Sequence, residues 1–194
     1  QIDGVLIRNQ EVVHQVRLAL GRRAQSEPVR CCAQATDHHL YGVYRDRDDR
    51  VRVILTRRPD HMRTHPGDVV FPGGRLEPGE GPEDTAKREA CEEIGLPEAG
   101  VRIVGGLTPI TTRDPGNLIV PVVATVQRPA EFVLQEEEVS AVIEPTVADL
   151  LDDTGWRTSD WFGRTLWFYE FDEGIMWGAT AFMMREFLSI LRNV

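Results

Sequence analysis

The sequence contains few cysteines, no long apolar run and a deficit of positive charge. Its three cysteines, Cys31, Cys32 and Cys91, offer no disulfide framework, so we expect reduced thiols and a cytoplasmic location. The longest apolar stretches, such as Leu118–Val126, are strand-sized and too short to cross a bilayer. The 22 Lys and Arg against 31 Asp and Glu give a formal net charge of −9, which argues against broad binding to nucleic acid or to an anionic membrane.

The composition is that of an ordinary globular protein. Hydrophobic residues make up 41% of the 194 residues and charged residues make up 27%. This length and composition predict one compact domain over residues 1–194, with no internal repeats and no low-complexity linker. A small anionic ligand is compatible with the acidic balance where a local basic patch or a metal ion receives it. The sequence leaves the oligomeric state open, and a homodimer is possible.

Hydrophobic spacing predicts strands mixed with only a few helices. The expected strands cover residues 40–45, 51–56, 68–71, 101–108, 118–126 and 165–170. The expected helices cover residues 10–23, 82–94, 147–151 and 177–191, the first of them within an N-terminal helical extension at about 1–27. This mixture favours the α/β class and a layered sandwich over a regular βαβ repeat.

The predicted helix at 82–94 carries acidic residues where helix electrostatics disfavours them. Glu92 and Glu93 lie three and four residues after Glu89, so their side chains neighbour that of Glu89 and repel it. Glu92 and Glu93 also fall in the last turn, where the helix dipole disfavours negative charge. A bound divalent cation would remove both penalties, since Mg²⁺ takes carboxylate oxygens and leaves positions for water or substrate phosphate. The alternative is a solvated charged face, which is what most acidic helices are.

The surroundings of these glutamates form a specific motif. Residues 74–96 match every fixed position of the pattern G-x5-E-x7-R-E-U-x-E-E-x-G-U (U aliphatic), with the small Ala90 at the first U. The chain therefore resembles the Nudix hydrolases, which cleave a nucleoside diphosphate linked to another moiety. The resemblance implies the Nudix fold, an α/β/α sandwich with a mixed β-sheet. In that fold the Nudix box, here 74–96, forms a loop–helix–loop that holds Mg²⁺ or Mn²⁺.

The resemblance also implies roles for individual residues by position. Glu89 and Glu93 are the expected main metal ligands, with Glu92 alongside and the carbonyl of Gly73 as a further ligand. Arg88 is expected to hold the carboxylates in orientation. Together with the three glutamates it makes up the expected catalytic set.

A second motif indicates a subfamily. Residues 55–74 are similar to the L-T-x-R-[SA]-x3-R-x3-G-x3-F-P-G-G signature of coenzyme A pyrophosphatases, with Pro59 in place of the small residue. Residues 175–181 resemble the W-G-x-T-A stretch of the same subfamily. The resemblance implies hydrolysis of coenzyme A and its derivatives to 4′-phosphopantetheine and adenosine 3′,5′-bisphosphate. The alternatives are a Nudix pyrophosphatase for ADP-ribose, dinucleotides or other nucleoside diphosphate derivatives, and a Nudix-fold binding module without turnover.

The second motif places positive charge beside the acidic helix. Coenzyme A carries a diphosphate and a 3′-phosphate, and guanidinium groups bind phosphate through charge-assisted hydrogen bonds. Arg57, Arg58 and Arg63 are therefore the candidate substrate-binding residues. Arg58 and Arg63 are favoured as ligand contacts, whereas Arg57 is equally consistent with a surface ion pair.

Other polar and aromatic residues allow more than one interpretation. The general base is either Glu92 or one residue of the acidic run 136–138, namely Glu136, Glu137 or Glu138. The pair His38 and His39 has no metal-ligand spacing and is expected at the surface. Four tryptophans are candidates for lining a pocket for adenine or pantetheine, although packing in the core is their default: Trp156, Trp161, Trp167 and Trp177.

Overall fold

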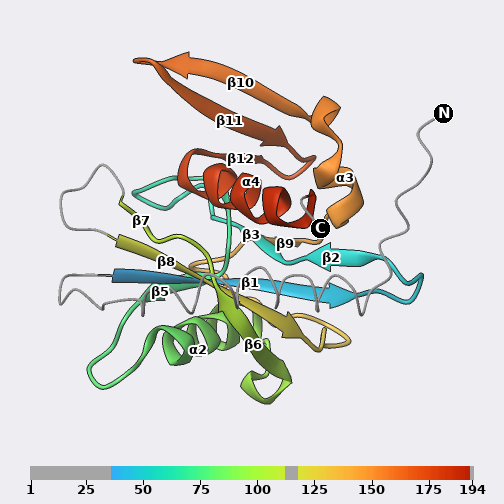
Figure 1. The fold of residues 1–194 in the computed structure, drawn as a ribbon. Coiled ribbons are helices and arrows are strands. Elements are labelled where there is room, and N and C mark those ends of the chain that lie inside the picture. The colour runs from blue at the N-terminus through green and yellow to red at the C-terminus, as the bar shows by residue number, and fades with distance from the viewer. Residues whose placement is uncertain (1–35, 112–117, 193–194) are drawn as a thin grey trace.

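The computed structural model of the chain describes residues 36–111 and 118–192 (Figure 1). The helix expected at 10–23 within the extension 1–27, and the adjacent cysteines at 31 and 32, lie outside these ranges.

A six-stranded mixed sheet forms the centre of the fold. Its strands are β1 (Thr36–Arg45), β2 (Val51–Val53), β5 (Gly73–Arg75), β6 (Val101–Gly106), β7 (Ile110–Thr111) and β8 (Leu118–Val126). The strand β1 lies parallel to β8 and antiparallel to both β2 and β5, so it occupies the middle of the sheet. This position places β5, the start of the Nudix box, directly beside the central strand.

Two three-stranded antiparallel sheets complete the strand content of the described ranges. One contains β3 (Leu55–Arg57), β4 (Val69–Val70) and β9 (Ala141–Ile143), and the other contains β10 (Trp156–Trp161), β11 (Arg164–Glu170) and β12 (Ile175–Trp177). The single strand expected at 51–56 is therefore wrong in one respect. It divides at Ile54, whose N–H donates to the carbonyl of Gly42, and its two halves join different sheets.

Helices cover both faces of the central sheet. The helices are α2 (Pro82–Ile94), α3 (Val147–Leu151) and α4 (Gly178–Arg192), and α2 and α4 lie on opposite faces of the sheet (Figure 1). Because successive side chains of a strand point to opposite faces, β1 gives Leu40 and Tyr44 to the core beneath α2, and Tyr41 and Val43 to the core beneath α4. The predicted α/β/α sandwich is confirmed. In the described residues, no helix combines the length and apolar character needed to cross a membrane.

Local sequence signals determine both ends of α2. Gly81 is the N-cap and Pro82 follows at the first helical position, while the Asp84 carboxylate accepts a hydrogen bond from the Gly81 N–H at 3.2 Å. The helix ends at Gly95, whose φ of +66° lies in the left-handed region that glycine adopts without strain. The predicted bounds 82–94 are confirmed.

The expectation that His38 and His39 lie at the surface is wrong. His38 is fully buried, and the Nδ1 atom of His39 lies 3.1 Å from the carbonyl oxygen of Phe71. Burial lowers the pKa of His39 below its usual value. Both residues belong to the central strand β1, which is paired on each side, and this burial depends on strand pairing that a local pattern does not reveal.

Candidate active site

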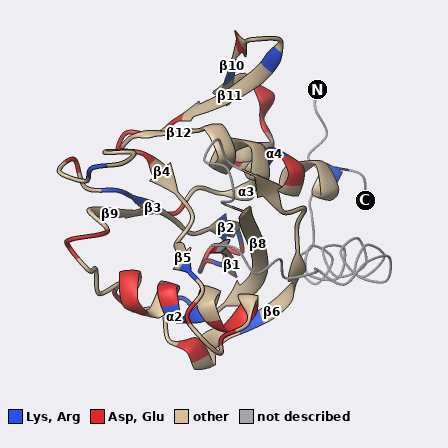
Figure 2. Cartoon of the chain, turned by 90° about the vertical axis from the view of Figure 1, so that its left-hand side faces the viewer, with Lys and Arg blue, Asp and Glu red and all other residues tan. Residues whose placement is uncertain are grey.

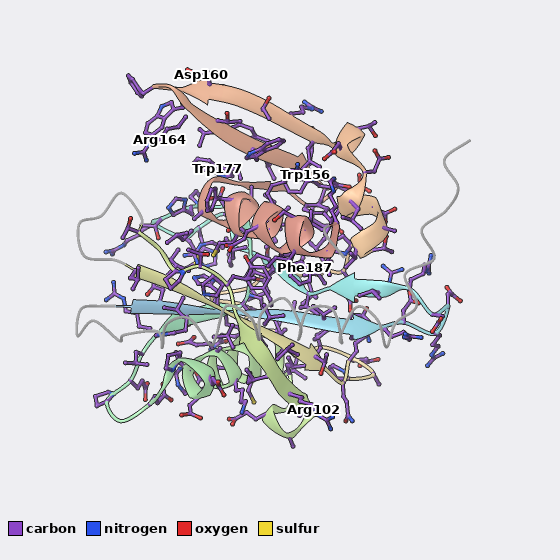
Figure 3. The ribbon with its side chains drawn as sticks, viewed as in Figure 1. Arg102, Trp156, Asp160, Arg164, Trp177 and Phe187 are labelled. Carbon is purple, nitrogen blue, oxygen red and sulfur yellow. The ribbon has the colours of Figure 1, made fainter. Side chains whose placement is uncertain are left out.

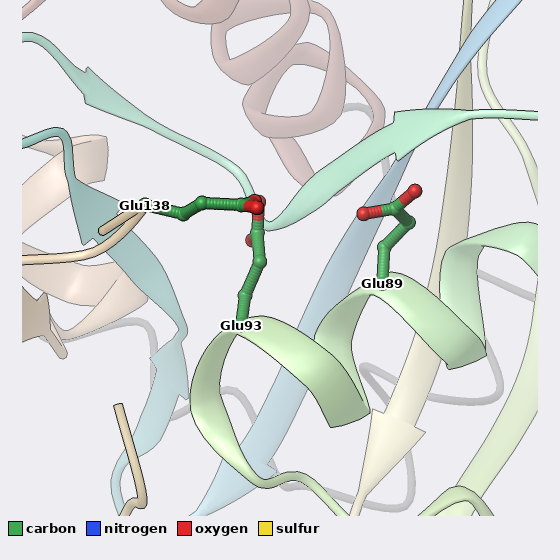
Figure 4. Close-up of side chains that lie close together, drawn as sticks. All are labelled: Glu89, Glu93 and Glu138. Atoms are coloured by element: carbon green, nitrogen blue, oxygen red, sulfur yellow. The ribbon is translucent and has the colours of Figure 1, made fainter. Parts of the chain in front are cut away.

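Three carboxylates from two segments of the chain converge at one place. Glu89, Glu93 and Glu138 each offer an oxygen atom, and these oxygens all lie within 4.8 Å of one another (Figure 4). Glu89 and Glu93 lie one turn apart on α2, so they point the same way. Glu138 reaches them from the loop that precedes β9. These residues are called the carboxylate cluster below.

Backbone hydrogen bonds hold the Glu138 loop against the end of α2. The N–H of Gln135 donates to the carbonyl of Glu93 at 2.9 Å, and the N–H of Val133 donates to the carbonyl of Ile94 at 3.2 Å. The side chain of Val139 is buried, which anchors the loop on the other side of Glu138. The loop therefore presents Glu138 to the cluster, while Glu136 and Glu137 of the same acidic run stay exposed and outside it.

Two glycines of β5 lie against the carboxylates of α2. The N–H of Gly73 donates to Oε2 of Glu93 at 3.2 Å. A Cβ atom on Gly74 would lie 2.5 Å from the carboxylate carbon of Glu89, so only glycine leaves that space to Glu89. The Gly73 amide is thus the group seen in contact with the cluster, and the role of its carbonyl as a metal ligand stays a prediction.

Burial makes negative charge unfavourable in the cluster. The pKa of Glu93 rises to about 8, chiefly because the side chain is buried and secondly because Glu89 is close, while the Gly73 N–H and Arg58 pull it down. Burial also raises the pKa of Glu89, and Arg88 opposes that rise. Oxygen donors held together against their own repulsion suit a hard divalent cation, whose charge would stabilise all three carboxylates. The residues present therefore fit Mg²⁺ or Mn²⁺.

Arg88 joins the glutamates of the Nudix box. Its Nε and Nη2 atoms donate to Glu80 at 2.8 and 3.1 Å, and its Nη1 atom donates to Glu89 and to Glu92, each at 2.9 Å. The hydrogen bonds from Arg88 to Glu80 lower the pKa of Glu80 to about 2. Arg88 therefore contacts Glu80, Glu89 and Glu92 at once, and its role in orienting the carboxylates stays a prediction. Glu92 is not part of the cluster, and its side chain, which is 60% exposed, is paired with Arg88.

The three candidate arginines differ in how their guanidinium groups are used. Arg57 donates to Asp60 at 2.6 Å, to Oγ of Ser140 at 3.0 Å and to the carbonyl of Glu173 at 2.6 Å. These bonds tie β3 to the start of β9 and to the loop before β12, which is a structural role. The ion-pair alternative raised for Arg57 thus matches its contacts.

Arg58 and Arg63 keep their charge available. The Nε atom of Arg58 donates to the carbonyl of Thr64 at 3.3 Å, and its positive charge lowers the pKa of both Glu93 and His39. Arg58 therefore lies within electrostatic reach of the carboxylate cluster. Among the described residues, neither Arg58 nor Arg63 has a carboxylate partner. Figure 2 shows the acidic residues of α2 and the basic residues of the segment between β3 and β4.

The four tryptophans divide into a packed pair and an exposed pair. Trp156 is buried and its Nε1 atom donates to the carbonyl of Leu150 at 2.8 Å, while the guanidinium of Arg185 lies 4.3 Å from the ring of Trp167. Trp161 and Trp177 are 36% and 37% exposed. Core packing accounts for the first pair only.

Comparisons with known proteins agree with the site. Residues 39–162 match the NUDIX domain. The chain is 34% identical over 139 residues to the uncharacterized Nudix hydrolase NudL of Enterobacter sp. (strain 638), a match that covers 69% of this chain and 72% of that protein. It is 39% identical over 111 residues to Nudix hydrolase 3 of Caenorhabditis elegans, covering 56% of this chain but 46% of that protein. The chain thus spans about half the length of the nematode relative.

Solved structures support the fold. A C. elegans Ap4A hydrolase superposes with a TM-score of 0.54 at 15% identity, covering 82% of this chain and 99% of that one. A MutT/nudix family protein from Enterococcus faecalis gives a TM-score of 0.55 at 14% identity, covering 100% of this chain and 75% of that one. Identities this low show the fold alone. The domain match and the 34% identity to a relative over more than two thirds of both chains place this chain in the Nudix family of hydrolases.

Proposed function

We propose that the chain hydrolyses the diphosphate bond of coenzyme A. Water adds to one phosphorus, the bond from that phosphorus to the bridging oxygen breaks, and 4′-phosphopantetheine and adenosine 3′,5′-bisphosphate are released. The observation that carries the proposal is the placement of Arg58, with no carboxylate partner among the described residues, within electrostatic reach of the carboxylate cluster. Arg58 belongs to residues 55–74, which match the signature of coenzyme A pyrophosphatases.

The cluster supplies the ligands for a divalent cation. Glu89 and Glu93 would hold Mg²⁺ or Mn²⁺, with Glu138 facing them from its loop. Such an ion, when bound, neutralises phosphate charge and polarises the phosphoryl oxygens. Arg88 fixes the orientation of Glu89, and the Gly73 N–H does the same for Glu93. Ligands held in this way need little rearrangement during the reaction, which favours catalysis.

Glu138 is our choice among the four candidate bases. It lies at the cluster, whereas Glu92 is paired with Arg88 and the two neighbours in the acidic run face solvent. As the most exposed member of the cluster, it can accept a proton from the attacking water and return it to solvent. Glu138→Gln should therefore lower kcat strongly while changing metal affinity less than Glu93→Gln does. Equal losses of metal affinity would make Glu138 a ligand instead.

Arg58 and Arg63 are proposed to bind the phosphates of coenzyme A. We assign Arg58 to the diphosphate, because it lies within electrostatic reach of the carboxylate cluster, and Arg63 to the 3′-phosphate. ADP-ribose and dinucleotides share the diphosphate but lack the 3′-phosphate. The contact between Arg63 and the 3′-phosphate would therefore distinguish coenzyme A from these alternative substrates. A binding module without turnover is disfavoured, because it would have no need for three mutually repelling carboxylates.

A comparison of coenzyme A with dephospho-coenzyme A tests this assignment. A charge-assisted contact contributes about 1.5–3 kcal/mol, so coenzyme A should be preferred by roughly ten- to a hundredfold in kcat/KM. Arg63→Ala should remove most of the preference, and Arg58→Ala should weaken both substrates alike. Arg57→Ala is the matched control and should leave the preference intact, because its guanidinium is engaged elsewhere. An unchanged preference in Arg63→Ala would refute the assignment.

A further inference from the structure

An aromatic pair occupies the outer face of the small sheet formed by β10, β11 and β12. Side chains alternate along these strands, so Met176 is buried toward α4 while its neighbour Trp177 faces the opposite way and is 37% exposed. Phe168 lies directly opposite Trp177 in the β11–β12 register. The two rings are nearly parallel, with an interplanar angle of 7° and centroids 6.4 Å apart. Figure 3 shows Trp177 at the end of the sheet nearest the first turn of α4.

The loop between β3 and β4 connects this aromatic pair to the carboxylate cluster. Arg58 begins the loop and influences Glu93, while the ring of His65, near its end, lies 6.1 Å from the Trp177 ring. The Nδ1 atom of His65 is 2.9 Å from Oδ2 of Asp68, which fixes the orientation of the imidazole. Asp68 in turn forms a β-bridge with Ile175 at the start of β12. One short loop therefore carries both a cation within electrostatic reach of Glu93 and an imidazole near the Trp177 ring.

The space beside Trp177 is open. A Cβ atom added to Gly178, the next residue, would meet no atom within 4 Å. Arg63, in the same loop as His65, is exposed and has no carboxylate partner in the described ranges. An exposed indole with a parallel ring beside it and a cation nearby suits a planar, π-rich group that carries phosphate.

We propose that Trp177, with Phe168 beside it and His65 at its edge, stacks against the purine base of the nucleotide substrate. The inference rests on the proposed function, because the phosphates of that same molecule must lie between the rings and the cluster. A nucleobase fits the rings better than the pantetheine arm does, since stacking needs a flat π-system. The occupant is a small molecule rather than a protein surface, because the loop that touches Trp177 carries Arg58 and Arg63.

Titration calorimetry with each half of coenzyme A tests the proposal on the full chain. Trp177→Leu should weaken binding of adenosine 3′,5′-bisphosphate roughly five- to a hundredfold, the range expected for one stacked base. It should leave binding of 4′-phosphopantetheine unchanged, and Trp177→Phe should retain most of the adenosine affinity. With coenzyme A as substrate, Trp177→Leu should raise KM and leave kcat nearly unaltered.

Trp161→Leu is the matched control. Trp161 is 36% exposed and lies opposite Arg164 in the β10–β11 register. Arg164 is four residues before Phe168 along β11. Its strand position is therefore about 13 Å from the proposed platform. The control should bind both halves of coenzyme A as the wild type does. Thermal melts of every variant show whether each one folds, and the ring-retaining Trp177→Phe keeps the test decisive if Trp177→Leu is destabilised.

Three outcomes would separate the possibilities. Equal losses of adenosine affinity in Trp177→Leu and Trp161→Leu would overturn the stacking role. A loss confined to 4′-phosphopantetheine would also overturn it and would assign the rings to the pantetheine arm. If the wild type cleaves no coenzyme A but Trp177→Leu still weakens adenosine 3′,5′-bisphosphate selectively, the proposed function fails and the stacking platform stands.

Discussion

Replacement of Glu93 by glutamine should stabilise the metal-free protein, and the gain should grow as the pH rises. Burial raises the pKa of Glu93 from 4.5 to about 8. A carboxyl whose pKa is higher in the folded state binds its proton more tightly there than in the unfolded chain. Its contribution to stability is therefore complete below about pH 4.5 and is lost as the pH rises through about 8. Glutamine keeps the shape of the side chain and cannot ionise.

The size of the effect follows from the proton that the folded state retains. Between the two pKa values, one such group removes about 1.4 kcal/mol of unfolding free energy per pH unit. At pH 7 the accumulated loss is about 2–3 kcal/mol after allowance for partial solvation of the buried carboxyl. For a protein of this size, that corresponds to roughly 4–12 °C in melting temperature. At pH 5 the difference between Glu93→Gln and the wild type should be small.

Thermal melts in the presence of a chelator, recorded from pH 5 to pH 8, measure this difference. Glu83→Gln is the matched control, because Glu83 is an exposed glutamate in the first turn of the same helix. Addition of Mn²⁺ should reverse the order, since the wild type gains binding energy that the variant lacks. Parallel pH profiles for Glu93→Gln and the wild type would refute the argument that burial penalises charge in the cluster.

Three further changes probe the groups around the cluster. Gly74→Ala places a methyl group 2.5 Å from the Glu89 carboxylate carbon, so turnover should fall roughly 10–100-fold in steady-state kinetics. Full activity of this variant would show that Glu89 need not occupy that space. Glu92→Gln should lower turnover far less than Glu89→Gln, because Glu92 lies outside the cluster, and equal losses would contradict that placement. Arg88→Lys should lower the melting temperature, because an ammonium group cannot bind Glu80, Glu89 and Glu92 together as the planar guanidinium does. An unchanged melting temperature would count against this bonding pattern.

Features encoded by neighbouring residues were predictable from the sequence. The bounds of α2 follow from Pro82 at the first helical position and Gly95 at the end, which are local signals. The spacing of Glu89 and Glu93 puts both on one face of the helix, independently of contacts with the rest of the chain. The fold class and two members of the carboxylate cluster were therefore accessible before the structure.

Features that depend on contacts between distant segments were not predictable in the same way. The choice of Glu138 from three successive glutamates rests on backbone hydrogen bonds between its loop and the end of α2. The burial of His38 results from strand pairing on both sides of β1. The strand β10 was missed because its polar residues face solvent and its partner β11 defines it. Arg57 and Arg58 are neighbours in sequence, and only their contacts distinguish a structural arginine from an available one.

Analysis of the reaction products is the most direct test of the central claim. The purified chain is incubated with coenzyme A and Mg²⁺, and the products are separated by chromatography and identified by mass. We predict equal amounts of 4′-phosphopantetheine and adenosine 3′,5′-bisphosphate, with no reaction in the presence of a chelator or in Glu93→Gln. Faster cleavage of ADP-ribose or NADH than of coenzyme A under the same conditions would contradict the proposed substrate.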